Sequence, residues 1–247
     1  MPEPGAAEIT PKPAAGRIFR NGRRIRLGDV DPTGRCRLDA TVRHLQDIAR
    51  DDSADADLTD PMNWVVRRTM LEMHQAPVFQ EWIDLATWCS GHGGRWAERR
   101  TEIRGDHGAY VEAVTVWIYV DGETGAPKKL LPDFFELYGE SAGERTVSAR
   151  QQLPSKPPET ASETPWPVRF ADLDVLGHVN NAAHWQSVEE VRSQLGVATS
   201  KIRAEIEFSA GVERGTATLR VEPSEGGFTS WLMTPTATGS VARITPW

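Results

Sequence analysis

The chain carries two stretches that match each other at a constant spacing, and this internal repeat restricts the fold more than any other feature of the sequence. An arginine, two aspartates and a glycine recur without a gap, each 143 residues later: Arg26 and Arg169, Asp29 and Asp172, Asp31 and Asp174, Gly34 and Gly177. An ungapped match of this kind predicts that the 247-residue chain consists of two copies of one unit. The copies differ at a chemically important place, because Arg35 stands in the first where His178 stands in the second.

The pattern of apolar residues assigns the same order of elements to both copies. In each copy an extended run leads into the motif, and the motif leads into an amphipathic helix, at residues 38–50 and 182–194. Four strand-like segments follow each helix, at residues 63–73, 83–91, 96–104 and 109–120 and then at 202–208, 216–222, 229–233 and 237–244. One helix followed by closely connected strands predicts an α+β fold in which the helix lies on an antiparallel sheet. We therefore expect two βαββββ units that pair side by side.

The segments outside these elements divide the chain. Residues 1–16, rich in Ala, Pro and Glu, are expected to form a disordered arm. Residues 140–165 are rich in Ser, Thr, Pro and Glu and are expected to link two units at 17–139 and 166–247. The small, acidic run at residues 51–57 is typical of a solvated loop.

Composition excludes several classes of function. A net charge of -7 disfavours general binding to nucleic acid, which requires a basic surface. Two cysteines, Cys36 and Cys89, make no disulfide framework and favour a reducing compartment. The sequence contains no Cys-x2-Cys or His-x3-His spacing, so we expect no metal, and nothing indicates an organic cofactor. Because the N-terminal residues lack an apolar run, we expect neither a signal peptide nor a membrane span, and a cytoplasmic location.

The second copy of the motif concentrates groups that can perform acid–base chemistry. Histidine is the side chain that ordinarily titrates near neutral pH, so His178 is the candidate base. Asp174 lies four residues earlier across a turn, where it could orient the imidazole or stabilise its charge. Backbone N–H groups near residues 181–183, at the start of the helix, would stabilise an oxyanion.

A structural interpretation of the same residues stays open. A turn followed by a helix cap uses the same residue types: Asp174, Gly177, Asn180 and Asn181. Asp172 is expected to pair with Arg169, as Asp29 would with Arg26 in the first copy. On the second helix, Glu189 or Glu190 could also reach the site.

The run Asp172-Leu173-Asp174, followed by Gly177-His178-Val179-Asn180-Asn181, resembles the signature of hotdog-fold thioesterases. The two-copy length, with strands such as residues 63–68 and 117–120, is similar to the acyl-ACP thioesterases, which are double-hotdog enzymes of fatty-acid synthesis. The resemblance implies a double hotdog that hydrolyses fatty acyl thioesters of acyl carrier protein (ACP) to the free fatty acid. It also implies catalytic roles among His178, Asp174, Asn180 and Asn181.

Two departures from the plant members of that family concern the detailed mechanism. Plant members carry Asn two residues before the histidine, where this chain has Leu176. Their downstream catalytic Glu aligns near residues 211–213, where Glu213 is the nearest carboxylate. The resemblance therefore adds Glu213 to the candidate catalytic residues.

The first unit is expected to bind the substrate. Its long, aromatic strands would line an acyl tunnel, with core packing as the alternative for most members: Trp64, Val66, Met70, Trp88, Trp96 and Trp117. A locally basic set would attract an acidic carrier or the phosphates of coenzyme A, with a solvated strand face as the alternative: Arg67, Arg68, Arg95, Arg99, Arg100, Arg104, Lys128 and Lys129. From these sets we take Trp64, Arg67, Arg68 and Arg99 as candidate substrate-binding residues. Asp31, in the first motif, is a rival catalytic centre.

Three alternatives to an acyl-ACP thioesterase stay open. Single-domain relatives with a similar motif hydrolyse acyl-coenzyme A. The fold also hosts hydratases and dehydratases, which are the second alternative. The third is a non-catalytic acyl-binding module, which is favoured by Leu176 in the place of the family's Asn. The expected partner is therefore an ACP or coenzyme A thioester, with no nucleic acid or membrane, and a homodimer of the two-copy chain is left open.

Overall fold

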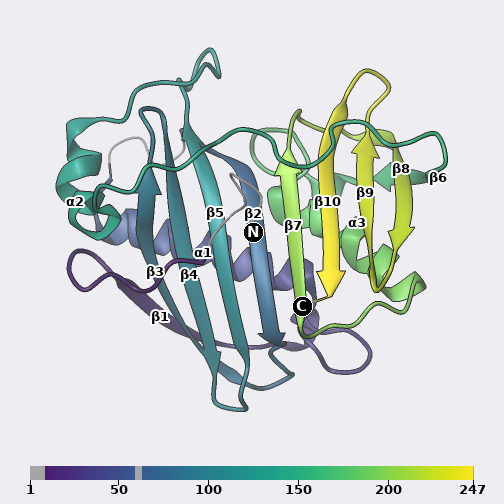
Figure 1. The fold of residues 1–247 in the computed structure, drawn as a ribbon, viewed down its shortest axis with the longest axis horizontal. Coiled ribbons are helices and arrows are strands. Elements are labelled where there is room, and N and C mark those ends of the chain that lie inside the picture. The colour runs from purple at the N-terminus through teal and green to yellow at the C-terminus, as the bar shows by residue number, and fades with distance from the viewer. Residues whose placement is uncertain (1–8, 59–62, 247) are drawn as a thin grey trace.

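A computed structural model describes residues 9–58 and 63–246 (Figure 1). Within them, ten strands form one antiparallel sheet, five from each copy. The first five are β1 (Phe19–Arg24), β2 (Trp64–Gln75), β3 (Trp82–His92), β4 (Trp96–Gly105) and β5 (Tyr110–Tyr119). The second five are β6 (Ser162–Val168), β7 (Ile202–Phe208), β8 (Gly215–Ser224), β9 (Gly227–Met233) and β10 (Thr238–Pro246).

The strand order is symmetric about the centre of the sheet. It runs β1-β3-β4-β5-β2 in one half and β7-β10-β9-β8-β6 in the other, so β2 and β7 meet at the junction. There Arg68 lies opposite Glu207 and Met73 opposite Ile202 in antiparallel register. The two βαββββ units are thus related by a pseudo-two-fold axis at this junction, which confirms the predicted α+β double-hotdog class.

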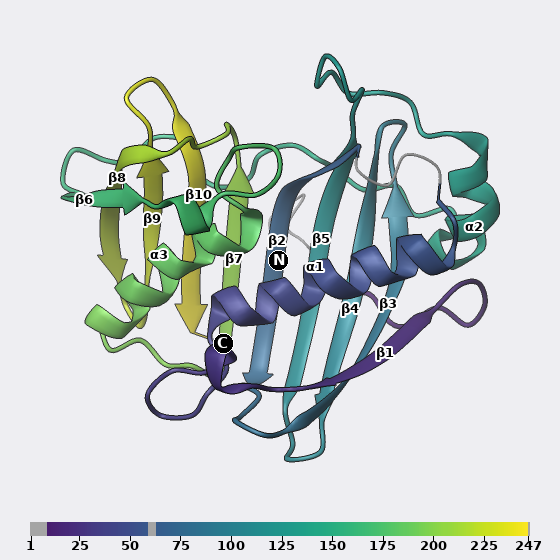
Figure 2. The same ribbon diagram turned by 180° about the vertical axis from the view of Figure 1, so that it is seen from behind.

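Two helices cover one face of the sheet (Figure 2). They are α1 (Leu38–Asp55) and α3 (Asn181–Gln194), and each follows a short 3-10 turn, Leu27–Asp29 or Phe170–Asp172. The apolar stripe of α1 is buried as its spacing predicts, and Trp185 and Val188 of α3 join the same core. A third helix, α2 (Pro132–Ala142), packs near β3 at the edge of the first half.

The helix α1 is longer than predicted, and the solvated loop expected at residues 51–57 is wrong. The helix continues to Asp55, and the Asp52 side chain is 0% exposed. Its carboxylate accepts hydrogen bonds from Arg17 at 2.7 Å, Arg99 at 2.6 Å and Tyr138 at 3.0 Å. The local sequence does not reveal this burial, because the three partners of Asp52 come from distant segments.

The linker and part of the N-terminal arm pack on the other face of the sheet. The chain from α2 to β6 crosses this face in Figure 1, and the N–H groups of Gln152 and Leu153 donate to the Glu207 carboxylate at 2.9 and 3.0 Å. Ile9 packs beside buried Met70, so residues 9–16 of the expected disordered arm run along the sheet; residues 1–8 lie outside the described part. No helix among the described residues is both long and apolar enough to cross a membrane.

Candidate active site

The two motif loops have the same hydrogen bonds, which gives the sequence repeat a structural meaning. In the second loop, Asp174 N–H donates to the His178 carbonyl at 2.9 Å and Gly177 N–H donates to the Asp174 carbonyl at 3.0 Å. The equivalent bonds of the first loop, at residues 31–35, measure 2.8 and 2.9 Å. Gly177 has a φ of 79°, in the left-handed region that favours glycine. Each loop is therefore a tight turn that leads into a helix N-terminus.

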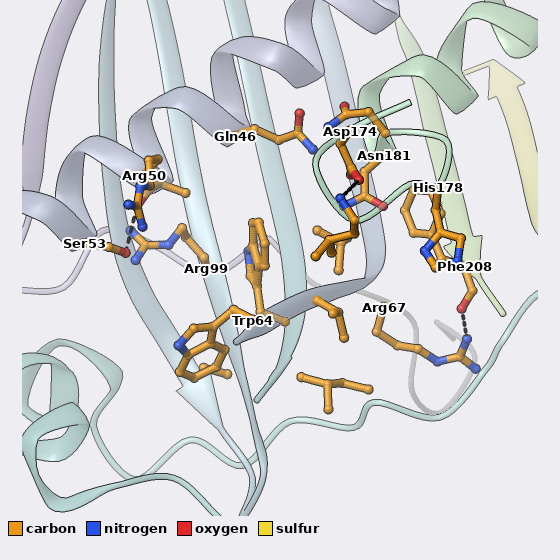
Figure 3. A pocket seen from close by; sticks show the side chains of 18 of the residues that line it. Gln46, Arg50, Ser53, Trp64, Arg67, Arg99, Asp174, His178, Asn181 and Phe208 are labelled. Atoms are coloured by element: carbon orange, nitrogen blue, oxygen red, sulfur yellow. Dashed lines mark hydrogen bonds between the residues drawn. The ribbon is translucent and has the colours of Figure 1, made fainter. Parts of the chain in front are cut away.

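A large cavity opens beside the second loop, and the first loop takes no part in its wall. Its volume is about 920 Å³, within the range of small-molecule sites, and its wall includes parts of α1, β2, β4, β5, α2 and the second loop. Figure 3 shows how both halves contribute side chains to it. The cavity brings together seven of the nine candidate residues: Asp174, His178, Asn180, Asn181, Trp64, Arg67 and Arg99.

His178 is exposed at the wall of this cavity and lies against the backbone of Gly211. A Cβ atom placed on Gly211 would be 2.7 Å from His178 Cδ2, so the absence of a side chain at residue 211 makes room for the imidazole. The Asp174 carboxylate instead accepts from Leu176 N–H at 2.9 Å. No hydrogen bond joins the Asp174 carboxylate to the His178 ring within the described residues, so Asp174 holds the turn that carries His178.

The N-terminus of α3 faces the same cavity. Asn180 caps the helix, with its side-chain oxygen accepting from Ala182 N–H at 2.9 Å. Ala183 N–H donates to the Asn180 carbonyl at 2.8 Å. Two of the three predicted oxyanion donors are therefore already used, and the remaining donor is the Asn181 N–H, at the positive end of the helix dipole.

His184 is a second imidazole in the wall, and the sequence analysis did not single it out. Burial lowers the pKa of His184 to about 4, and its Nδ1 lies 2.9 Å from Ser240 Oγ. Its ring also meets Phe208 edge-on at 5.2 Å. A helical register that buries Trp185 and Val188 could have indicated that His184 faces inward.

Other wall residues were missed because they lie on α1, far from the motif in sequence. Gln46, Arg50 and Ser53 line the cavity from one side of this helix. In Figure 3, Gln46 points toward the loop that carries Asp174, whereas Arg50 and Ser53 gather near Arg99 at the other end of the cavity. Cys89 also lines the wall, but burial raises the pKa of its thiol to about 11, so it is no thiolate nucleophile at neutral pH.

Two candidate residues do not belong to the site. Glu213 is exposed and lies outside the cavity wall, because the chain turns outward after Val212. Arg68 is buried beside Glu207, its partner across the β2–β7 junction, with 3.7 Å between Nη1 and Oε1.

Two other arginines line the cavity but have protein partners. Arg99 donates to Asp52, and Arg67 donates to the Phe208 carbonyl. The predicted basic set is thus no continuous patch, since Arg100 is buried and paired with Glu112 at 2.8 Å.

The pairing predicted for the aspartates of the 3-10 turns is half right. Arg169 Nη2 lies 2.6 Å from Asp172 Oδ1, as expected. In the first copy, however, Asp29 lies 3.6 Å from Arg43 rather than pairing with the Arg26 side chain. Asp29 accepts only the backbone N–H of Arg26, at 2.8 Å.

In the first copy, protein groups surround the carboxylate of the rival centre. Asp31 accepts from Thr33 N–H at 2.8 Å and lies 3.9 Å from Arg192 Nη2. Asp31 is not part of the cavity wall. Glu189, a candidate for the second site, lies near the first loop instead. Its carboxylate accepts a hydrogen bond from Leu38 N–H at 3.1 Å.

Comparison with protein families agrees with the arrangement of the two halves. The model of the acyl-ACP thioesterase N-terminal domain matches residues 16–138, and that of the acyl-ACP thioesterase C-terminal domain matches residues 155–233. The chain belongs to the acyl-ACP thioesterase family. The predicted family is thereby confirmed, and membership makes the chain a thioester hydrolase.

One relative agrees with this chain in length, and two solved structures agree with it in fold. An uncharacterised protein of Mycobacterium tuberculosis (strain ATCC 25618 / H37Rv) is 29% identical over 208 residues, which is 84% of this chain and 83% of that protein. A Lactobacillus plantarum protein assigned as an oleoyl thioesterase superposes with a TM-score of 0.78 at 22% identity, covering 94% of this chain and 96% of that one. The 12:0-ACP thioesterase from Umbellularia californica gives a TM-score of 0.76 at 18% identity, covering 93% and 98%. At these identities the two structures show a shared fold.

Proposed function

We propose that this thioester hydrolase acts on fatty acyl-ACP, releasing a free fatty acid and ACP. The observation that carries the proposal is the large cavity that joins the second motif loop to the strands of the first half. Its wall is largely apolar around Trp64, Val66 and Phe134, which suits an acyl chain, and polar groups stand at both ends, at the loop and around Arg99. The thioester would lie beside His178 with its chain directed toward α2.

The residues of the loop suit addition of water to a thioester. The carbonyl oxygen would accept from Asn181 N–H at the start of α3, where the helix dipole favours negative charge. His178 would take a proton from water as the water oxygen bonds to the thioester carbon. When the C–S bond breaks, the same imidazolium would return the proton to the leaving thiolate, so the atoms and charges balance.

The departure at Leu176 leaves this arrangement intact. Asp174 is bonded to the backbone N–H of Leu176, and the equivalent bond to Thr33 N–H in the first copy shows that the turn does not depend on the side chain at that place. The Leu176 side chain is 60% exposed. This favours the hydrolase over the non-catalytic acyl-binding alternative, because the proposed base keeps its place.

The carrier can be tested by measuring thiol release from matched acyl-ACP and acyl-coenzyme A thioesters. Dodecanoyl chains come first, since the Umbellularia californica relative is named for that length. We expect a higher kcat/KM with ACP and a loss of turnover in His178→Ala. The control is His107→Ala, an exposed histidine in the β4–β5 turn, which should leave turnover unchanged. A higher kcat/KM with coenzyme A would contradict the ACP assignment.

A further inference from the structure

In the first half, a carboxylate of the chain itself lies at the N-terminus of a helix, where an anion could bind. The N–H of Leu38, the first residue of α1, donates to Glu189 Oε2 at 3.1 Å. Arg192 holds this carboxylate from the other side and donates to the Val197 carbonyl at 2.9 Å. The place where an oxyanion would bind in the first copy is therefore filled by the chain's own glutamate.

The repeat shows which residues take these places in the second copy. Adding the spacing of 143 residues brings Leu38 onto Asn181, the first residue of α3. Because the pseudo-two-fold axis exchanges α1 and α3, the place of Glu189 is taken by Gln46 and that of Arg192 by Ala49. Both residues line the cavity, and Gln46 points toward the loop that carries Asn181 (Figure 3).

These two exchanges account for an open site in one half and a filled site in the other. Alanine lacks the long side chain with which Arg192 fills the first site, so space remains beside α1. Glutamine has the reach of glutamate but no charge, so it does not compete as an anion for the helix N-terminus. Its amide can donate hydrogen bonds, which a carboxylate cannot.

We propose that the Gln46 side-chain amide donates a hydrogen bond to the thioester carbonyl oxygen, opposite the Asn181 N–H. Gln46 is then a catalytic residue, and the two donors together bind the oxyanion. As water adds to the carbonyl carbon, the C=O electron pair moves onto this oxygen. The pair returns to form the carboxylic acid when the thiolate leaves. The inference rests on the proposed function, and the Glu189 carboxylate marks the position that the oxyanion takes.

The kinetic test compares Gln46→Ala, Gln46→Glu and the matched control Glu189→Gln, all assayed at a temperature at which circular dichroism shows each variant to be folded. With dodecanoyl-ACP we expect Gln46→Ala to lower kcat by about 10²- to 10³-fold with little change in KM, as for other oxyanion donors. Gln46→Glu should lose more, because a carboxylate repels the oxyanion. Glu189→Gln should keep the wild-type kcat, since it belongs to the filled site. A kcat for Gln46→Ala within threefold of wild type would overturn the inference and leave the proposed function standing.

A binding test separates failure of the inference from failure of the proposed function. Decanoate carries a carboxylate that would lie between Asn181 N–H and Gln46, whereas decanol carries none. In calorimetry we expect Gln46→Ala to weaken decanoate about tenfold or more and decanol hardly at all. If Gln46→Ala lost equal affinity for decanoate and decanol, the role of Gln46 would be merely structural and the inference would be overturned. This outcome can be read even if the wild type hydrolyses no acyl-ACP.

Discussion

The buried histidine of α3 makes the stability of the protein depend on pH in a predictable way. His184 has a pKa of about 4 in the folded chain because burial disfavours the imidazolium, against an ordinary value of 6.5. The unfolded chain therefore binds this proton below pH 6.5, whereas the folded chain binds it only near pH 4. Stability from the neutral imidazole is complete above pH 6.5 and is lost as the pH falls from 6.5 to 4. At about 1.4 kcal/mol per pKa unit, the loss is about 3 kcal/mol.

Urea unfolding of the wild type and His184→Gln at several pH values between 4 and 7 measures this contribution. Glutamine can still bond to Ser240 Oγ but does not titrate in this range, so the wild type should be the more stable protein at pH 7. Its advantage should shrink by about 3 kcal/mol at pH 4. His107→Gln, at an exposed histidine, should run parallel to the wild type. If the difference in unfolding free energy between wild type and His184→Gln changed by less than about 1 kcal/mol between pH 4 and pH 7, His184 would not have the lowered pKa described here.

Three further substitutions test other parts of the structure. Asp52→Asn should destabilise the chain by about 3 kcal/mol in urea unfolding, because it leaves two buried arginine contacts without a carboxylate; a loss below 1 kcal/mol would contradict this. Gly211→Ala should lower kcat with unchanged melting, because its Cβ would displace the His178 ring, whereas Gly28→Ala, with open space around it, should not; equal kcat values would refute the placement. Ala49→Leu should shift the preference toward shorter acyl chains in a chain-length panel, and an unchanged profile would place the acyl chain elsewhere.

The repeat predicted the fold well because equivalent positions in the sequence also have equivalent hydrogen bonds in the structure. The constant spacing marks equivalent residues, and the same hydrogen bonds around Asp31 and Asp174 follow from it. Element ends were less predictable where tertiary contacts decide them. Asp52 is the example, since its burial depends on Arg17, Arg99 and Tyr138, which no local pattern connects.

The candidate site was predictable only on the side of the motif loop. His178, Asn180 and Asn181 were found because they are neighbours in the sequence. Gln46 and Ala49 could not be found without the pairing of β2 with β7, which brings α1 of one half against the loop of the other. Arg68 was misplaced because its burial depends on Glu207 of the other half, which it meets only where β2 pairs with β7.

We propose that His178, held in the second motif loop, activates water for hydrolysis of an acyl-ACP thioester. Single-turnover hydrolysis of dodecanoyl-ACP with excess enzyme tests it most directly, because it isolates the chemical step from binding and product release. We expect rapid release of dodecanoate by the wild type and a rate about 10²- to 10⁴-fold lower for His178→Ala. A His178→Ala rate equal to that of the wild type would show that His178 is not the base.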